Sequence, residues 1–239
     1  MVTDTGSVMQ LRSLSVHWLG RIGYDAALAL QDRLVELRRG RAAADTLLLL
    51  EHDPVVTMGR GGRPEHVLHT REELDRRGVQ LRDSGRGGDA TYHGPGQLVG
   101  YPILDLGPDR RDVRRYVTDL EEVMIRLAML YGLRARRIDG LRGVWVDDRK
   151  LGAVGVRISR WVTKHGFALN AETDLENFGL IVPCGISNCQ VTSVARETGR
   201  PIDLERLAKQ TGRVFAEVFA CEPRWHDGPP TALPEAPDP

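Results

Sequence analysis

The sequence predicts an α/β (α+β) fold in a single domain built on a mixed β-sheet. Three observations lead to this class: strand-like runs outnumber helical ones, several of them follow one another in hairpin order, and three long segments keep helical spacing of apolar residues. The chain has 239 residues, of which 41% are hydrophobic and 28% charged, so it is long enough to bury one sizeable core.

The first half of the chain alternates short strands with helices. The segment 14–19 alternates apolar and polar residues, which is typical of a strand. The segment 24–39 places its apolar residues on one helical face and ends at Gly40. After this helix we expect, in order, strands at 47–51 and 55–58, a glycine-rich turn at 59–66, a short helix at 72–77, and strands at 79–83 and 98–106.

The second half is predicted to contain two amphipathic helices around a group of strands. Helical spacing is kept over 112–131 and again from residue 202 to 219, where Asp203 can cap the helix. Between them we expect strands at 143–146, 151–158 and 161–170, then a loop over 171–194 with a helical turn near 175–178. We expect a flexible arm at 1–12, a catalytic domain at 13–221 that includes Cys221 in its last helix, and a disordered proline-rich tail at 222–239.

Composition narrows the class of function. Lysine plus arginine equals aspartate plus glutamate at 33 each, which argues against charge-driven nucleic-acid binding. The sequence shows neither a secretory signal nor an apolar run long enough to span a membrane. Three cysteines without a CxxC pair predict no disulfide framework and no zinc ribbon, so we expect a cytoplasmic protein.

A glycine-rich segment is the most informative stretch of the chain. Residues 86–106 read RGGDATYHGPGQLVGYPILDL, with five glycines in the first 15 residues and an apolar run directly after them. Glycine allows close approach of a ligand or a second backbone, and Pro95 fixes a tight bend between two glycines. This pattern favours a binding wall that carries Thr91, Tyr92 and His93, and the alternative is a glycine-rich hairpin without a ligand.

Two residues are candidates for nucleophilic chemistry. Cys184 stands between Pro183 and Gly185, a context typical of a tight turn that presents a thiol, although a lone cysteine can also be a small buried hydrophobe. Lys150 is one of only three lysines among 33 basic residues, which favours a position that needs a titratable amine. The alternative for Lys150 is a solvated hairpin lysine. His93 and His165 are also candidates for the cation that stabilises a thiolate, and His165 can instead be a ligand, an orienting group or a core histidine.

Other motifs are missing or incomplete. The sequence has neither a P-loop nor an HExxH motif. The spacing Gly85-x-Gly87-x-x-Ala90 mimics a dinucleotide loop but lacks the strand-then-helix context. His66-x-x-His69 lacks an evident third metal ligand.

Taken together, five segments resemble the octanoyltransferases of lipoate biosynthesis, also called the lipoate–protein ligase B family. They occur in the family's order across most of residues 14–221, which makes the resemblance specific where any one motif would be weak. The segments are EHDPVVTMGR (51–60), RGGDATYHGPGQLVGYPI (86–103), RKLGAVGVRI (149–158), HGFALN (165–170) and IVPCGIS (181–187).

The resemblance implies an acyltransferase with a fold related to biotin and lipoate ligases, a lipid-sized pocket, and neither ATP nor metal as cofactor. It implies transfer of octanoyl from octanoyl-acyl carrier protein to a lysine of lipoyl domains, which occur in 2-oxoacid dehydrogenase E2 subunits and in the glycine-cleavage H protein. We expect the enzyme to be a monomer that binds neither nucleic acid nor membrane. The motif cysteine, Cys184, would form a thioester, and the motif lysine, Lys150, would lower the pKa of that thiol and handle protons. The implied substrate contacts are Arg86, Gly87, Gly88, Asp89, Ala90, Thr91, Tyr92, His93, Ala153, Val154, Gly155, Gly166, Phe167 and Ala168.

Alternatives remain at this point. An ATP-dependent lipoate or biotin ligase on the same fold predicts nucleotide binding without an acyl-cysteine, a binding module predicts no turnover, and a thioesterase predicts water as the acceptor. A cluster of arginines at the start of the helix over 112–131 either docks an acidic carrier protein or is a solvated basic face. Its members are Arg110, Arg111, Arg114 and Arg115.

Overall fold

The computed structural model describes residues 11–107, 109–182 and 189–230. A mixed sheet of eight strands forms its centre, in the order β11-β1-β2-β6-β10-β9-β8-β7, and a smaller sheet has the order β4-β3-β5. The strands of the large sheet are β1 (Arg12–Ile22), β2 (Asp45–His52), β6 (Gln97–Ile103), β7 (Arg136–Ile138), β8 (Leu141–Val146), β9 (Arg149–Ser159), β10 (Val162–Asn170) and β11 (Cys221–Asp227). The small sheet contains β3 (Val55–Met58), β4 (Gln80–Asp83) and β5 (Thr91–His93).

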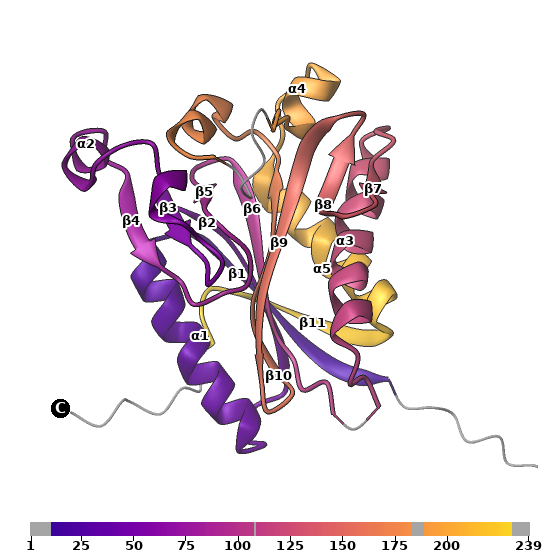
Figure 1. Cartoon of the computed structure of the whole chain (residues 1–239). Helices are drawn as coiled ribbons and strands as arrows, with labels where there is room; N and C mark the ends of the chain where they lie inside the picture. The colour runs from indigo at the N-terminus through magenta and orange to yellow at the C-terminus, as the bar shows by residue number, and fades with distance from the viewer. Residues whose placement is uncertain (1–10, 108, 183–188, 231–239) are drawn as a thin grey trace, which may run out of the picture.

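Helices cover both faces of the large sheet (Figure 1). α1 (Tyr24–Arg39) packs on one face against β6 and β10, while α3 (Val113–Leu130) and α5 (Leu204–Phe219) pack on the other. Asp112 and Asp203 accept hydrogen bonds from the first turns of α3 and α5, which fixes where these helices begin. The shorter helices are η1 (Pro64–His66), α2 (Arg71–Arg76), η2 (Leu175–Leu180) and α4 (Val194–Thr198).

The predicted fold class is confirmed, because strand pairing in the large sheet is parallel for β1 with β2 and antiparallel for β6 with β10 and β9 with β10. Apolar spacing correctly predicted α1, α3 and α5, since the structure buries the same faces that the sequence marked. The three-residue strands β5 and β7 and the five-residue helix α4 were not predicted, because elements this short carry too little periodicity.

The expected boundaries of both tails need correction. The predicted disordered tail begins too early, because β11 (Cys221–Asp227) adds to the open edge of β1 in parallel register, with Val16 opposite Trp225. Proline is compatible with an edge strand, so Pro223 did not exclude one, and Cys221 lies in β11 and not in the last helix. Similarly, Arg12 was assigned to the arm but begins β1; residues 1–10 and 231–239 lie outside the described residues.

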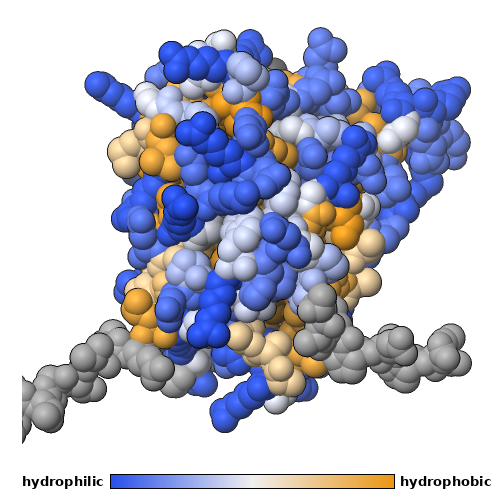
Figure 2. Space-filling view, turned by 180° about the vertical axis from the view of Figure 1, so that it is seen from behind, coloured by the Kyte–Doolittle hydropathy of each residue, from blue (hydrophilic) through white to orange (hydrophobic). Residues whose placement is uncertain are grey.

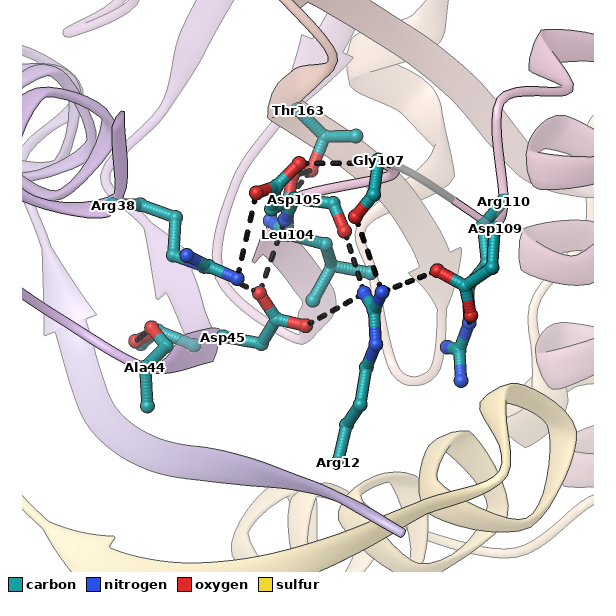
Figure 3. Close-up of polar contacts among 11 residues, drawn as sticks. Arg12, Arg38, Ala44, Asp45, Leu104, Asp105, Gly107, Asp109, Arg110 and Thr163 are labelled. Atoms are coloured by element: carbon teal, nitrogen blue, oxygen red, sulfur yellow. Dashed lines mark hydrogen bonds and ion pairs between the residues drawn. The ribbon is translucent and has the colours of Figure 1, made fainter. Parts of the chain in front are cut away.

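An ion-pair cluster joins four chain segments at the first residues of β1 and β2 (Figure 3). The Asp45 carboxylate accepts hydrogen bonds from the Arg38 guanidinium at 2.6 Å and from the backbone N–H of Asp105 at 3.0 Å. Arg12 lies 3.9 Å from the same carboxylate and donates to the carbonyl oxygens of Asp105 at 2.8 Å and Gly107 at 3.1 Å. The cluster therefore ties β1, α1, β2 and the end of β6 together.

One face of the molecule carries apolar residues mainly in small patches (Figure 2). The face seen from behind in Figure 2 is mainly hydrophilic, with apolar residues in small separate patches. Across the described part of the chain, no helix has both the length and the apolarity needed to cross a membrane.

Candidate active site

A cavity lies between the glycine-rich segment and the strands β9 and β10. It is partly open to solvent. The lining residues come from α1, the glycine-rich segment, β5, β6, β9 and β10: Tyr24, Arg86, Gly88, Asp89, Ala90, Thr91, His93, Tyr101, Ala153, Val154, Gly155, His165, Gly166, Phe167 and Ala168. The structure thus brings 12 of the 14 expected substrate contacts together in one hollow.

Gly87 and Tyr92 do not line this cavity. The backbone N–H of Gly87 donates to the Val156 carbonyl at 2.9 Å and holds the glycine-rich segment against β9. Side chains alternate along a strand, so Thr91 and His93 face the cavity while Tyr92 points to the other side of β5. There the Tyr92 ring packs edge-on against Phe178 with ring centroids 5.6 Å apart, which makes it a core residue of the small sheet.

Glycines allow the cavity walls to approach one another. A Cβ atom on Gly166 would lie 2.1 Å from the Gly100 carbonyl oxygen, which no side chain tolerates. A Cβ atom on Gly155 would lie 3.0 Å from Cδ of Arg86 and 3.1 Å from the Gly87 oxygen. The small residues of β9 and β10 therefore set the width of the cavity.

Arg86 anchors the glycine-rich wall. Its guanidinium donates to the Thr57 carbonyl oxygen at 2.7 Å and to the Thr57 hydroxyl at 3.0 Å, and it also donates to the Gly87 carbonyl oxygen at 3.1 Å. The side chain is buried at 8% exposure, so these acceptors satisfy a charge that would be costly to bury alone. Arg86 therefore joins β3 to the wall of the cavity.

Two buried neutral histidines, His93 and His165, line the cavity, and a third, His52, packs edge-on against His93. Burial lowers the pKa of His93 and of His165 to about 3, and that of His52 to about 4. His52 donates through Nδ1 to the Ile22 carbonyl oxygen at 2.9 Å, which leaves Nε2 to accept from the Tyr101 hydroxyl at 2.8 Å. These rings present fixed hydrogen-bonding atoms without adding charge.

A chain of side-chain hydrogen bonds leads from His93 across three strands. Gln97 Nε2 donates to Asn170 Oδ1 at 2.9 Å, so Gln97 Oε1 is the acceptor for His93 Nδ1 at 2.7 Å. Asn170 Nδ2 then donates to the Thr192 carbonyl oxygen at 2.9 Å. The chain holds β5, β6 and β10 in register with the segment that begins at residue 189.

Lys150 lies in a second hollow that adjoins the cavity. A smaller hollow that contains Lys150 shares Thr91, Ala153 and Ala168 with the main cavity. Lys150 is only 5% exposed, and its Nζ atom lies 5.4 Å from the centroid of the Trp145 ring. The alternative of a solvated hairpin lysine is therefore wrong.

Cys184 lies outside the described residues, but the chain on both sides of its segment is anchored near the hollow. On one side the Val182 N–H donates to the His66 carbonyl oxygen at 2.8 Å. On the other, the Lys150 N–H donates to the Gln190 carbonyl oxygen at 2.8 Å, and the Thr192 N–H donates to the Lys150 carbonyl oxygen at 2.9 Å. One of these two anchors is thus the candidate lysine itself.

Two further expectations fare differently. Arg110 and its neighbours lie near the β9–β10 turn, because Leu106 pairs with Trp161, whereas Lys150 is at the far end of β9, about 30 Å away at about 3.3 Å per residue. Asp109 and Asp119 pair with Arg110 and Arg115 there, which offsets part of the positive charge of the cluster. Docking of an acidic carrier protein on this cluster stays a prediction.

The His66-x-x-His69 pair does not form a metal site in the part of the chain that the structure describes. His66 Nδ1 lies 2.5 Å from the Asp89 carboxylate, and His69 Nδ1 lies 3.6 Å from Glu73. Within the described ranges, no group of three or more histidine, cysteine, aspartate or glutamate residues is placed to hold a metal.

Sequence reasoning missed Tyr24 and Tyr101 and left the role of His165 open. Tyr24 begins a helix and Tyr101 lies within an apolar run, so neither has a local signal for a cavity position. His165 has a φ of 59°, which is uncommon for a residue other than glycine. Only the packing of α1 against β6 and β10 brings the three rings together.

Comparison with known proteins gives a consistent family. Residues 23–216 match the model of the lipoyl protein ligase A/B catalytic domain. The chain is 49% identical over 212 residues to the octanoyltransferase of Solibacter usitatus, which covers 89% of this chain and 96% of that protein. It is 49% identical over 217 residues to the octanoyltransferase of Chloroflexus aurantiacus, which covers 90% of this chain and 97% of that protein. It is 44% identical over 218 residues to the octanoyltransferase of Myxococcus xanthus, which covers 89% of this chain and 61% of that longer relative.

Solved structures share the fold. The crystal structure of lipoate-protein ligase A bound with ATP superposes with a TM-score of 0.71 at 17% identity, covering 92% of this chain and 89% of the other. A putative lipoate protein ligase from T. acidophilum gives a TM-score of 0.69 at 17% identity, with the same coverage. At this level of identity the likeness concerns the architecture alone and confirms the expected ligase-like fold.

Proposed function

This chain belongs to the lipoyl protein ligase A/B catalytic domain family, with octanoyltransferases as its relatives, and we propose that it transfers octanoyl from octanoyl-acyl carrier protein to a lipoyl-domain lysine through a thioester on Cys184. The octanoyltransferase relatives, at 44–49% identity, make the chain an acyltransferase. The acceptors we propose are the lipoyl domains of 2-oxoacid dehydrogenase E2 subunits and the glycine-cleavage H protein. The observation that carries the proposal is the buried Lys150 in a small hollow that adjoins the cavity lined by the expected substrate contacts.

The first half-reaction moves the acyl group onto the enzyme. The Cys184 thiolate attacks the carbonyl carbon of the donor thioester, a carbon–sulfur bond to Cys184 forms, and the bond to the carrier's sulfur breaks. The Lys150 ammonium stabilises the thiolate and then gives its proton to the departing carrier thiolate. The carrier leaves as a thiol, and Lys150 is left as a neutral amine.

The second half-reaction restores the starting state. The amine of the acceptor lysine attacks the Cys184 thioester, an amide bond forms, and the bond to sulfur breaks. Lys150 accepts the proton that the attacking amine loses, so the thiolate and ammonium pair is regenerated. Converting a thioester to an amide is favourable, so we propose that the reaction needs neither ATP nor a metal.

The hollow suits this chemistry in size and charge. Ala153, Gly155 and Gly166 present little bulk along β9 and β10, and the histidines beside them are neutral, so an alkyl chain meets no unpaired charge there. The Arg86 guanidinium donates a hydrogen bond to the Thr57 carbonyl oxygen, so its positive charge is directed at a backbone acceptor.

Mass spectrometry of the acceptor separates this proposal from an ATP-dependent ligase. A lipoyl domain is incubated with the enzyme and either octanoyl-acyl carrier protein without ATP or free octanoate with ATP. We expect octanoylation of the lipoyl domain only with the carrier-bound donor. Cys184→Ala should abolish the transfer while Cys189→Ala, a matched thiol removal, should retain it; modification with octanoate and ATP would support a ligase instead.

A further inference from the structure

A β-bulge in β9 determines which face of the large sheet carries the Lys150 side chain. Trp145 of β8 lies opposite Lys150. The preceding residue, Val144, lies opposite Gly152, so Leu151 is an extra residue on β9. Residues directly opposite one another share a face of an antiparallel sheet, and neighbours along a strand alternate between the faces. The side chain of Lys150 and the α-carbon side of Gly152 therefore point to opposite faces, which on a regular strand they would share.

The two faces have different surroundings. On the helix-covered face, a Cβ atom on Gly152 would lie 2.6 Å from Sδ of Met124 on α3. On the other face, Lys150 lines its hollow together with Ala153 and Ala168, which also line the main cavity. Without the extra residue in β9, the Lys150 side chain would be directed at α3 and away from the cavity.

Gly143 of β8 makes room for the Lys150 side chain beside the bulge. Its φ is 103°, a conformation that side-chain-bearing residues rarely adopt. A Cβ atom at this position would lie 2.9 Å from Cε of Lys150 and 2.4 Å from the Gly152 carbonyl oxygen. The path of the Lys150 side chain therefore depends on Gly143 keeping this conformation.

Glu121 of α3 holds Gly143 in place. Its Oε1 atom accepts a hydrogen bond from the Gly143 backbone N–H at 2.9 Å, and its Oε2 atom accepts one from Nε of Arg137 at 3.2 Å. Glu121 is only 3% exposed. Burying a carboxylate is costly unless it is paired and hydrogen-bonded, so Arg137 allows a charged acceptor to be placed at the Gly143 N–H.

Trp145 contacts the lysine at its charged end. The centroid of its ring lies 5.4 Å from Nζ of Lys150, within the range of cation–π attraction. Trp145 is itself buried, and the bulge places it directly opposite the lysine. Gly143 and Trp145, two residues apart on β8, thus lie beside the Cε atom and the Nζ atom of Lys150.

We propose that Glu121 is a positioning residue for acyl transfer, which acts through Gly143 and the β9 bulge to keep the Lys150 amine on the cavity face. Without the Glu121 oxygen, the Gly143 N–H loses its buried acceptor and this part of β8 relaxes. Lys150 then leaves the position from which it exchanges protons. The proposal rests on the proposed function, because Lys150 is the proton-moving group of that reaction.

Amine labelling reads out the position of Lys150 without any acyl transfer. The chain has three lysines, so each can be followed separately by peptide mass spectrometry after a brief reaction with N-hydroxysuccinimidyl acetate. Lys164 is also buried and reports unfolding of the whole domain, whereas Lys209 is exposed and reports the strength of the reagent. The ratio of Lys150 to Lys164 labelling therefore measures a local change at Lys150.

Three variants separate the hydrogen bond to Gly143 from the general effect of removing an acid. Glu121→Leu removes the acceptor, and Glu121→Gln keeps an oxygen that accepts from the same N–H. Glu122→Leu is the matched control, because Glu122 also pairs with Arg137 but is more exposed than Glu121.

We expect Glu121→Leu to raise the Lys150-to-Lys164 labelling ratio about fivefold and to lower kcat for octanoyl transfer about 20-fold. KM for the donor should stay within about twofold, because no residue of α3 is among the described residues that line the cavity. Glu121→Gln and Glu122→Leu should remain within about twofold of the wild type in all three quantities. A purely structural role for Glu121 would raise the labelling of Lys150 and Lys164 together, and an unchanged ratio in Glu121→Leu would overturn the proposal.

Glu121→Asp carries the test if the leucine variant does not fold. It keeps a charge for Arg137 but withdraws the carboxylate from Gly143 by one carbon–carbon bond, about 1.5 Å, so the labelling ratio should still rise at least about twofold. A raised ratio in preparations whose wild type transfers no octanoyl would support the positioning and contradict the proposed function. Octanoyl transfer by the wild type, with the labelling ratio unchanged in the folded Glu121 variants, would do the reverse.

Discussion

The backbone N–H of Lys150 donates a hydrogen bond to the carbonyl oxygen of Gln190 at 2.8 Å. The residue proposed to move protons is therefore also a fixed point for the chain that follows the Cys184 segment. Lys150 belongs to β9, which pairs with β8 on one side and with β10 on the other. The sheet therefore sets the position of this residue.

Lys150→Arg should lower the transfer rate by about 100-fold or more. Arginine keeps the positive charge but cannot accept a proton from the attacking lysine amine at neutral pH. Steady-state octanoyl transfer measures the loss, with Lys164→Arg as a control on β10. Wild-type turnover in Lys150→Arg would restrict this residue to an electrostatic role.

Gly155→Ala should reduce kcat/KM for the donor by about 10-fold. The new methyl group would crowd Arg86 and Gly87 at 3.0 and 3.1 Å and shift the glycine-rich wall. Gly179→Ala is the matched control, since a Cβ atom there has nothing within 4 Å. Equal kinetics in the two variants would show that the width of the cavity at Gly155 does not matter for the donor.

Acidification should destabilise the fold through the buried histidines. Below the unfolded pKa of 6.5 the unfolded chain binds protons that His93, His165 and His52 do not bind in the fold, because their folded pKa values are lowered to about 3, 3 and 4. The free energy of unfolding therefore falls as the pH falls from 6.5 towards 4, by up to about 1.4 kcal/mol per pH unit for each histidine. Urea unfolding between pH 7 and 5 tests this, and His93→Asn should make the pH dependence shallower; an unchanged slope would mean that His93 is not buried as a neutral ring.

Asp45→Ala should lower the free energy of unfolding by about 3 kcal/mol and leave turnover near wild type. The change leaves Arg38 and the Asp105 N–H without their shared acceptor at the end of the molecule remote from Lys150 (Figure 3). Asp109→Ala removes a partner of Arg12 at a side chain that is 57% exposed and should cost less than about 1 kcal/mol. Denaturant titration of both variants checks the difference, and equal losses would contradict a dominant role for Asp45.

The sequence predicted the parts of the fold that carry strong local patterns. Helical spacing located α1, α3 and α5 because each buries one face over four or more turns. β11 was missed because an edge strand tolerates proline, and its pairing with β1 spans more than 200 residues of sequence.

The candidate site also contains residues that the sequence predicted and residues that it did not. The glycine-rich wall and Lys150 were predicted from residue type and motif order, and the structure places them in two adjoining hollows that share Thr91, Ala153 and Ala168. Tyr24 and Tyr101 were not, because contacts between rings on α1, β6 and β10 arise only from tertiary packing. Tyr92 was expected in the cavity, but strand alternation turns it into the core, which the motif alone does not reveal.

The proposed reaction proceeds through a thioester on Cys184, with Lys150 as the group that moves protons. Intact-mass spectrometry of the enzyme after mixing with octanoyl-acyl carrier protein tests it most directly, with Cys184→Ala and Cys189→Ala as paired variants. We expect one octanoyl adduct on the wild type and on Cys189→Ala, none on Cys184→Ala, and loss of the adduct when a lipoyl domain is added. An adduct that persists in Cys184→Ala, or transfer to the lipoyl domain by that variant, would contradict the account.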